Sequence, residues 1–430
     1  MSSLRLTGLW RQRDFRHLWA AETVSQVGTQ ITMLALPVLA VSLLHATPFE
    51  MGVLTALETA AFLVIGLPAG AWVDRWRRKR VLVVNDLVRA LALASLPVAY
   101  ALDAISLTQL FVVATITGTA TVFFDIAYQS YLPTLVAPAQ VVEGNAKLAA
   151  SMEVARVAGP GVTGVLLKIL GAPVLIAFDA LSFLLSALFI GGIRHREVVP
   201  DRAARRPLRV EIAEGLGFVV RHPLLRRIVA CTGLFNLFSS MTMALLVLFV
   251  LRTLGLSESM LGFVFSAGAV GGIVGAATAA RFAQRVGEGR AIPLASMVCA
   301  LAGVLIPLSV IGAPVPLLVA GWFVESWGVV AYNVTQVSFR QRLCPPGLLG
   351  RMNASVRFIV YGTMPLGGLV GGALGEWLGV TATLWVAAVG GFVACVPVVL
   401  SPLLGMRDLP ADQDGGAGVS EPLDRVAEQA

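Results

Sequence analysis

The chain has 430 residues, of which 57% are apolar and 13% are charged. Soluble domains carry about 25% charged residues, so this chain has too few charges to cover a soluble surface of its size. The composition excludes a soluble globular protein, a disordered chain and a collagen-like one, and it indicates a membrane protein throughout. The net charge is +7, and the basic residues lie in short stretches between apolar segments. This distribution indicates that they set the orientation of the chain in the membrane and argues against a nucleic-acid partner.

Twelve apolar segments are long enough to cross a bilayer, which takes about 20 residues. In chain order we expect spans at about 17–44, 48–72, 81–102, 106–132, 143–169, 173–193, 225–252, 257–282, 290–312, 314–340, 351–377 and 380–402. Most of the basic residues, Arg340 among them, fall on one side of this arrangement. By the positive-inside rule, both termini are expected in the cytoplasm. We expect a multi-pass protein of a bacterial-type inner (plasma) membrane.

A long basic segment divides the spans into two groups of six. We expect an N-terminal six-helix bundle over 1–193, a cytoplasmic linker over 194–224 that carries an amphipathic surface helix, a C-terminal six-helix bundle over 225–405, and a disordered cytoplasmic tail over 406–430. The predicted fold class is therefore an all-α membrane protein with twelve transmembrane helices in two bundles.

The two halves repeat each other. Gly159 and Gly164 in the fifth span recur 208 residues later as Gly367 and Gly372, and the Gly66 and Gly70 pair of the second span recurs in the eighth as Gly271 and Gly275. Parallel six-span halves are what a duplicated transporter gene leaves behind. The repeat thus predicts two pseudo-symmetric bundles.

The most specific motif follows the second span. Gly66 and Gly70 lie one helical turn apart, so we expect a neighbouring helix to approach this face closely. Asp74 then reaches the cytoplasmic boundary, where it is expected to meet a helix N-terminus or a basic side chain across a gate. We call these residues the gate motif: Gly66, Gly70, Asp74, Arg75, Arg78 and Lys79.

This glycine–aspartate–arginine signature resembles that of the major facilitator superfamily, and the resemblance covers the whole chain except the tail. The fifth span adds Gly159-Pro160 followed by Gly164, which resembles the antiporter motif of the drug:proton exporters in that superfamily. Segments 123–133, 217–223 and 350–368 look like the macrolide-efflux and enterobactin-exporter branch. The fourth span lacks the arginine of many such antiporters, so their proton relay is not carried over residue by residue.

Ionisable residues inside the spans are the candidates for function, because each costs about 2.5–3.5 kcal/mol at the bilayer centre on insertion scales. Arg156 is expected to reach Asp125 or Glu153, either as a permanent pair or as a switch that protonation releases. Glu58 and Glu325 are each either a neutral acid bonded to a neighbouring helix or a proton carrier. The proton-coupling candidates are Asp125, Glu325, Glu58, Glu22, Glu153 and Arg156.

Other charged residues of the spans have simpler interpretations. Asp86 and Arg89 are expected to form a local pair that braces the gate, and Asp103 and Asp179 are interpreted as structural. Around Glu325, aromatic and polar side chains suit an amphipathic or cationic substrate. The substrate-cavity candidates are Trp322, Tyr332, Asn333, Gln336, Arg357 and Tyr361.

Chemistry other than transport has little support in the sequence. The cysteines at 231, 299, 344 and 395 are scattered, so neither a disulfide nor a metal site is expected, and no GxxxxGK[ST] loop indicates ATP hydrolysis. No histidine lies at the middle of a span, so we expect no enzyme and no cofactor.

The sequence therefore predicts a secondary active exporter that exchanges protons for small amphipathic molecules, such as a drug, an antibiotic or a siderophore, by alternating access. A proton-coupled importer of the same fold is the main alternative, followed by a lipid scramblase or a membrane enzyme. The expected partners are a small-molecule substrate, protons and the lipid bilayer, and the chain is expected to be a monomer.

Overall fold

The computed structural model describes residues 8–73, 75–195, 197, 208–344 and 348–406. Helices account for nearly all of this part of the chain, and it contains no strand. Twelve of the described helices have 20 residues or more, and eleven of those are also apolar enough to cross a membrane. The exception is α5, which carries Glu153 and Arg156 along its length. The predicted all-α fold is confirmed, and the predicted spans agree with the helices within about four residues at each end.

The N-terminal bundle contains six long helices, of which the first ends in a π-helical turn, η2 (Leu39–Leu43). They are α1 (Arg13–Val38), α2 (Pro48–Val73), α3 (Arg78–Ala101), α4 (Leu107–Leu135), α5 (Val141–Leu170) and α6 (Ala172–Gly191). The C-terminal bundle repeats this order, and its first helix also ends in a π-helical turn, η4 (Phe249–Thr253). Its helices are α8 (Pro223–Leu248), α9 (Glu258–Val286), α10 (Glu288–Leu308), α11 (Pro314–Leu343), α12 (Leu349–Leu378) and α13 (Val380–Val399).

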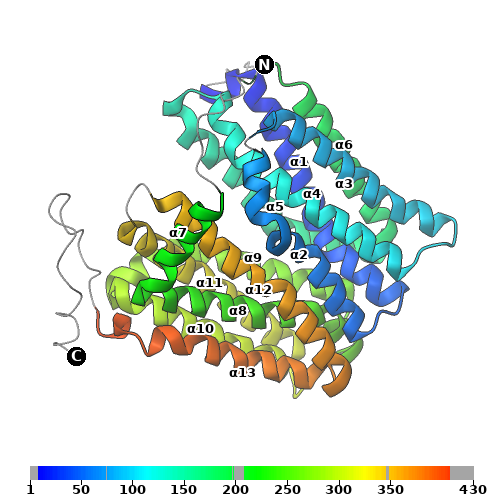
Figure 1. Cartoon of the computed structure of the whole chain (residues 1–430). Helices are drawn as coiled ribbons and strands as arrows, with labels where there is room; N and C mark the ends of the chain where they lie inside the picture. The colour runs from blue at the N-terminus through cyan, green and yellow to red at the C-terminus, as the bar shows by residue number, and fades with distance from the viewer. Residues whose placement is uncertain (1–7, 74, 196, 198–207, 345–347, 407–430) are drawn as a thin grey trace, which may run out of the picture.

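The two bundles meet mainly through two pairs of helices, α2 with α12 and α5 with α9, and α2 also contacts α8. Because the six-helix unit is repeated, these pairs are equivalent to each other. We call the end of the bundles where α1 begins and α13 ends the termini end, and the end that holds the α1–α2 and α8–α9 connections the far end. Figure 1 shows the bundles diverging toward the side where α7 (Leu208–Arg221) lies, where α1 begins and α13 ends.

The repeat extends to details that the sequence pattern does not show. Each π-helical turn is followed by a residue in the left-handed region, His45 (φ 53°) in the first half and Gly255 (φ 63°) in the second. Glycine adopts this conformation without the steric cost that a side chain brings. The same chain reversal therefore occurs twice, although only the second copy has the residue that favours it.

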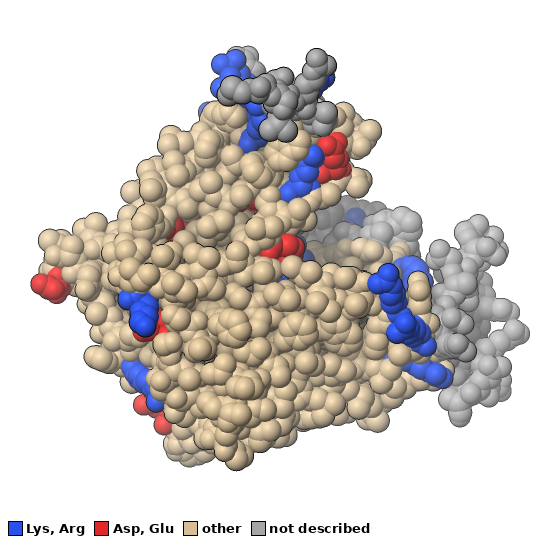
Figure 2. Space-filling view, turned by 180° about the vertical axis from the view of Figure 1, so that it is seen from behind, with Lys and Arg blue, Asp and Glu red and all other residues tan. Residues whose placement is uncertain are grey.

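The outer surface is apolar between the two ends. Large apolar side chains such as Leu91 and Trp377 are 73% and 84% exposed, and Figure 2 shows few charged side chains across the middle of the face it presents. A soluble protein rarely exposes so much contiguous apolar surface. This surface is suited to contact with lipid chains.

The linker contains the expected helix, α7, and its apolar side lies against α8 and α12. Val219 is buried with Met352 and Val356 of α12, and Glu214 pairs with Arg351 at 2.5 Å. The helix is thus fixed to the C-terminal bundle, and its contact with the leaflet stays a prediction. The predicted disordered tail lies, apart from Met406, outside the described residues.

Candidate functional site

A cavity of about 380 Å³ lies between the bundles, among α2, α4 and α12. From the N-terminal bundle, the half-buried Asp125 and the polar Gln129 line it, and from the C-terminal bundle Arg357 and Tyr361 do so. A carboxylate and a guanidinium from the two bundles therefore face the same space. We call it the inter-bundle cavity.

Gly66 and Gly70 of the gate motif also line this cavity, and a Cβ atom added at either would meet nothing within 4 Å. The prediction that a helix packs closely on this face is wrong for the first copy of the motif. In the second copy it is correct, because a Cβ atom at Gly275 would lie 2.8 Å from the carbonyl oxygen of Trp327 in α11. In the first half, α2 and α4 approach each other closely nearer the start of α2, where a Cβ atom at Gly118 would lie 2.6 Å from the Glu58 carbonyl oxygen.

The basic residues of the gate motif stabilise their own bundle. Arg78 donates through Nε to Ser130 Oγ of α4 at 3.0 Å. The ammonium group of Lys79 donates to the carbonyl oxygens of Gly191 and Ile193, at 2.8 and 2.6 Å, where α6 ends. A cation at a helix C-terminus is favourable because unpaired carbonyl groups concentrate there. Arg75 is exposed, and Asp74 lies outside the described residues.

The glycine–proline motif of α5 lies at the contact between the bundles. The hydroxyl of Ser266 in α9 donates to the Val157 carbonyl oxygen at 3.0 Å, and that of Ser259 donates to the Gly164 carbonyl oxygen at 3.1 Å. Within its own bundle, Gly159 faces Gln30 of α1 so closely that an added Cβ atom would lie 2.6 Å from the Gln30 Cβ. Pro160 is buried between these contacts.

Two glycine crossings close the far end. A Cβ atom at Gly164 would lie 2.9 Å from the Cα of Gly262 in α9, and one at Gly52 would lie 2.6 Å from the Cα of Gly372 in α12. Since Gly164 and Gly372 are equivalent in the repeat, these are two copies of the same backbone contact. The bundles touch at the far end and leave a cavity toward the termini end.

Side chains of the C-terminal bundle also hold the α1–α2 connection at the far end. The guanidinium of Arg252 donates to the carbonyl oxygens of Ala46 and Val41 at 2.9 and 2.7 Å. The carboxylate of Glu376 accepts from the Phe49 amide at 3.3 Å. We call this set the far-end latch.

A second space between the bundles, about 280 Å³, lies next to the α5–α9 contact. It is lined by Arg156 and Pro160 of α5 and by Trp322 and Glu325 of α11. Arg156 pairs with Glu153 at 3.8 Å, and both side chains are nearly half exposed. The proposed pair of Arg156 with Asp125 is therefore not formed, because Arg156 points into a different space. Glu325 shares that space, and its Oε2 is buried without a hydrogen-bond partner.

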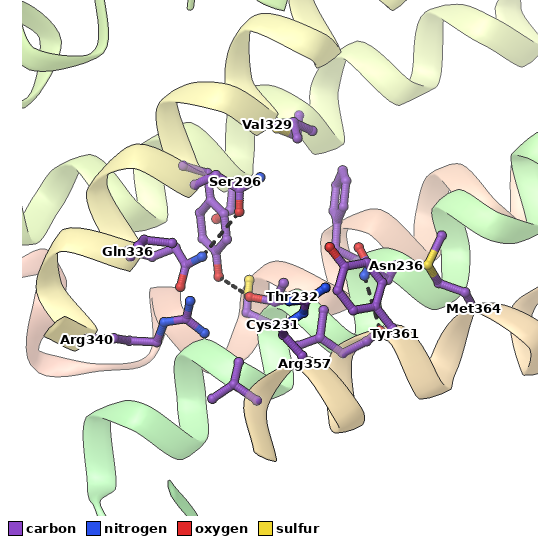
Figure 3. Close-up of a pocket in the computed structure, with 17 residues that line it drawn as sticks. Cys231, Thr232, Asn236, Ser296, Val329, Gln336, Arg340, Arg357, Tyr361 and Met364 are labelled. Carbon is purple, nitrogen blue, oxygen red and sulfur yellow. Dashed lines mark hydrogen bonds between the residues drawn. The ribbon is translucent and has the colours of Figure 1, made fainter. Parts of the chain in front are cut away.

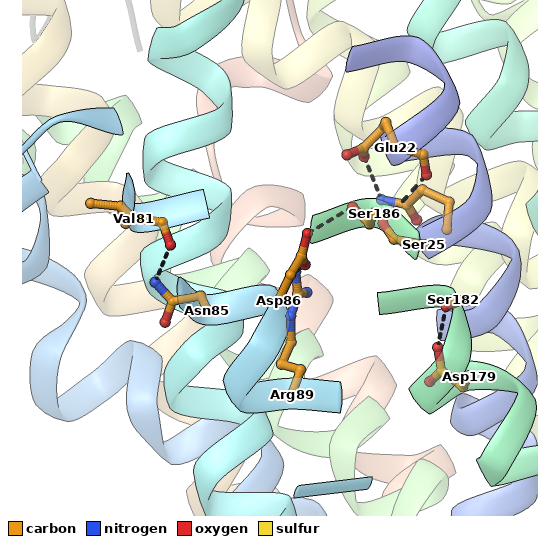
Figure 4. Close-up of polar contacts among 10 residues, drawn as sticks. Glu22, Ser25, Val81, Asn85, Asp86, Arg89, Asp179, Ser182 and Ser186 are labelled. Atoms are coloured by element: carbon orange, nitrogen blue, oxygen red, sulfur yellow. Dashed lines mark hydrogen bonds and ion pairs between the residues drawn. The ribbon is translucent and has the colours of Figure 1, made fainter. Parts of the chain in front are cut away.

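The interior of the N-terminal bundle holds a cluster of acidic groups around one arginine (Figure 4). Asp86 and Arg89 form the expected ion pair; it is completely buried, and Ser186 Oγ donates to Asp86 Oδ2 at 2.7 Å. The Arg89 guanidinium also lies 4.2 and 4.1 Å from the ring centres of Phe124 and Phe183.

Two other acidic side chains lie near this ion pair. Gln26 Nε2 donates to Glu22 Oε1 at 2.8 Å, while Glu22 Oε2 has no hydrogen-bond partner. Asp179 is also buried, with Ser182 Oγ donating to its Oδ1 at 2.9 Å. Glu58 lies half-buried on α2, away from these hydrogen bonds. Glu22 thus has an oxygen free for a proton inside the bundle, as a proton-coupling candidate requires.

A third cavity, of about 320 Å³, lies within the C-terminal bundle among α8, α10, α11 and α12 (Figure 3). It brings together five of the six substrate-cavity candidates; the sixth, Trp322, lines the space beside Glu325 instead. The five are Tyr332, Asn333, Gln336, Arg357 and Tyr361. We call this space the C-bundle cavity.

Sequence reasoning missed Arg340, which was counted with the basic residues of a loop. The structure places it inside α11, 9% exposed and lining the C-bundle cavity. The available signal was spacing: Tyr332, Gln336 and Arg340 follow one another at intervals of four, which places them on one helix face.

Comparisons with known proteins agree with this architecture. The family model of transmembrane secretion effectors matches residues 7–425. The multidrug efflux pump Tap of Mycolicibacterium fortuitum is 28% identical over 412 residues, 91% of this chain and 96% of Tap. The enterobactin exporter EntS of Escherichia coli is 25% identical over 381 residues, 85% of this chain and 87% of EntS.

Among solved structures, a bacterial homologue of the iron transporter ferroportin in its inward-facing state superposes with a TM-score of 0.76. It is 14% identical and covers 91% of this chain and 99% of its own, which shows the shared fold. The family model spans both bundles and their linker. The chain belongs to the transmembrane secretion effector family of the major facilitator superfamily.

Proposed function

We propose that the chain is a secondary exporter that exchanges protons for small amphipathic molecules, with both termini in the cytoplasm. Tap, an efflux pump, and EntS, an exporter, support the direction of transport. The position of the glycine–proline motif also supports exchange, because α5 contacts α9 of the other bundle there. On this assignment the far end faces outward, and the structure is a conformation open to the cytoplasm.

The observation that carries the proposal is the inter-bundle cavity, where Asp125 and Arg357 face each other from the two bundles. Ionised Asp125 attracts Arg357, whereas protonated Asp125 does so only weakly. In the proposed cycle, Asp125 releases its proton to the cytoplasm in the present conformation. Its attraction for Arg357 then favours closure of the termini end around bound substrate. A proton that enters from the far end later weakens that attraction, and the cavity returns to face the cytoplasm.

Purified protein in proteoliposomes, with a pH-sensitive dye in the lumen, tests this cycle. We expect enterobactin to move against an imposed proton gradient, and Asp125→Asn to abolish coupled proton movement. Asp103→Asn is the matched control, because Asp103 is an exposed carboxylate outside both cavities. Unchanged proton movement in Asp125→Asn contradicts the role of this carboxylate, and transport that follows the proton gradient contradicts export.

A further inference from the structure

The C-bundle cavity has an unusual balance of charge. Two arginines, Arg340 and Arg357, line it, and among the described residues around it no carboxylate is present. Figure 3 shows both guanidinium groups directed toward the space near Cys231 and Thr232. A cavity inside a membrane bundle therefore holds positive charge without a counter-charge of its own.

The two arginines differ in how their charge is compensated. Arg357 also lines the inter-bundle cavity, where Asp125 lies opposite, and its guanidinium contacts the Tyr361 ring at 5.8 Å. Arg340 is 9% exposed, its Nε has no hydrogen-bond partner, and no described carboxylate pairs with it. Buried charges are normally paired, since an unpaired one loses its hydration without compensation. Arg340 is the group that lacks a partner.

The side chains beside Arg340 offer further polar contacts. Gln336 is 3% exposed, donates through Nε2 to Asn333 Oδ1 at 3.2 Å, and leaves its Oε1 buried without a donor. One turn earlier, the Tyr332 hydroxyl is 2.8 Å from Thr232 Oγ1. Arg340 and Gln336 thus leave a cationic donor and an amide acceptor unused in the same cavity.

The rest of the cavity is apolar. Phe235, Val329, Val337, Val360 and Met364 also line the space. A volume of about 320 Å³ is at the lower end of the range for small-molecule sites, about 300–1,000 Å³. The lining therefore fits a ligand with an apolar body and one acidic group.

We propose that the C-bundle cavity binds an amphipathic anion, whose acidic oxygen atoms accept from Arg340 and whose apolar part lies among the valine, phenylalanine and methionine side chains. This inference rests on the proposed function, because it names the substrate class of the same exporter. Arg357 borders both cavities, so an anion passes it on the way in from the inter-bundle cavity. An anionic phospholipid headgroup offers the same chemistry, and the experiment separates the two sources.

Binding to the full chain in phosphatidylcholine nanodiscs tests the site without transport. The probe is naphthalene-2-sulfonate, and its neutral analogue naphthalene-2-sulfonamide has the same apolar body. We expect the sulfonate to bind at least about tenfold more tightly than the sulfonamide, and Arg340→Gln to remove that difference. Arg342→Gln is the matched control, because Arg342 is an exposed neighbour paired with Glu288 at 2.6 Å. Equal binding of the two probes, or discrimination that survives in Arg340→Gln, overturns the proposal.

Arg340→Met distinguishes a loss of anion binding from a loss of folding. Because it removes a buried unpaired charge, we expect its thermal unfolding temperature to equal or exceed that of the native chain while sulfonate stabilisation disappears. A lower unfolding temperature with sulfonate stabilisation retained contradicts the proposal. Adding phosphatidylglycerol to the nanodiscs separates the sources: competition that requires Arg340 assigns the site to a lipid headgroup, and its absence assigns it to a soluble anion. If coupled transport fails while sulfonate still binds, the proposed exporter function is contradicted and the proposed anion site is not.

Discussion

Replacing Arg252 by alanine should shift the chain away from the conformation described here. Arg252 lies in the C-terminal bundle, and its guanidinium donates to two carbonyl groups of the N-terminal bundle at 2.9 and 2.7 Å. Hydrogen bonds that involve a charged group contribute about 1.5–3 kcal/mol each. Arg252 is exposed, so we discount this to about 0.5–1 kcal/mol each for solvent screening. The two bonds together then give about 1–2 kcal/mol.

That free energy converts into a population change of roughly 5- to 30-fold toward conformations open at the far end. Both bonds break when the far end opens, because they cross between the bundles. Lys168→Ala serves as the control, since Lys168 is an exposed basic residue of α5 near the same end.

Distances between two spin labels, measured by double electron–electron resonance, report this shift directly. Cysteines introduced at Leu102 and Ile311 place labels on exposed positions of the two bundles, 72% and 79% exposed at the far ends of α3 and α10. The four native cysteines are all buried, which limits unwanted labelling. An unchanged distance distribution in Arg252→Ala, or an equal shift in Lys168→Ala, refutes the role of the latch.

Three further changes test other parts of the molecule. At Gly372 an added Cβ atom would lie 2.7 Å from the Cα of Gly52, so Gly372→Leu should force the far end open and lengthen the distance between the same two spin labels. Gly303→Ala is the control: a Cβ atom there would meet nothing within 4 Å, so the distance should not change. Asp86→Asn leaves Arg89 buried without its partner, so it should lower the free energy of unfolding by about 3–5 kcal/mol. Thermal or denaturant unfolding measures this change, and a free energy equal to that of the native chain would contradict the prediction. Burial lowers the pKa of His222, whose neutral ring accepts from the Leu225 amide and caps α8. The folded-state pKa of His222 is below its ordinary value of 6.5, so the cap is fully present above that value and is lost as pH falls through the lower folded-state value. His222→Asn should flatten the dependence of unfolding temperature on pH below 6.5, and an unaltered profile would exclude the cap as its source.

The fold was largely predictable because the bilayer imposes a simple rule. A segment that crosses lipid must satisfy its backbone polar groups internally, so the spans are long helices, and eleven of the twelve long helices are apolar enough for sequence alone to reveal them. The duplication was readable as well, since Gly164 and Gly372 keep their place in equivalent helices.

The site was less predictable because it depends on how helices of different bundles face each other. Arg156 was expected to reach Asp125 or Glu153, and it pairs with Glu153. α5 directs it into the space beside Glu325, while Arg357 of α12 shares the cavity with Asp125. No local pattern encodes such a pairing between segments about 200 residues apart. Arg340 illustrates the other limit: near the end of a span, a basic residue that sets topology and one that lines a cavity have the same sequence signature.

The glycine crossings at the far end have a consequence for how the substrate specificity of such a transporter can evolve. At Gly52 with Gly372 and at Gly164 with Gly262, the two halves meet backbone against backbone. The side chains that support this seal, Ser259, Arg252 and Glu376, bond to backbone groups and line none of the three cavities. Residues that line the cavities can therefore vary in size, charge and polarity without altering the surfaces that seal the far end. The fold separates the part that recognises cargo from the part that keeps the membrane closed, and each is free to change on its own.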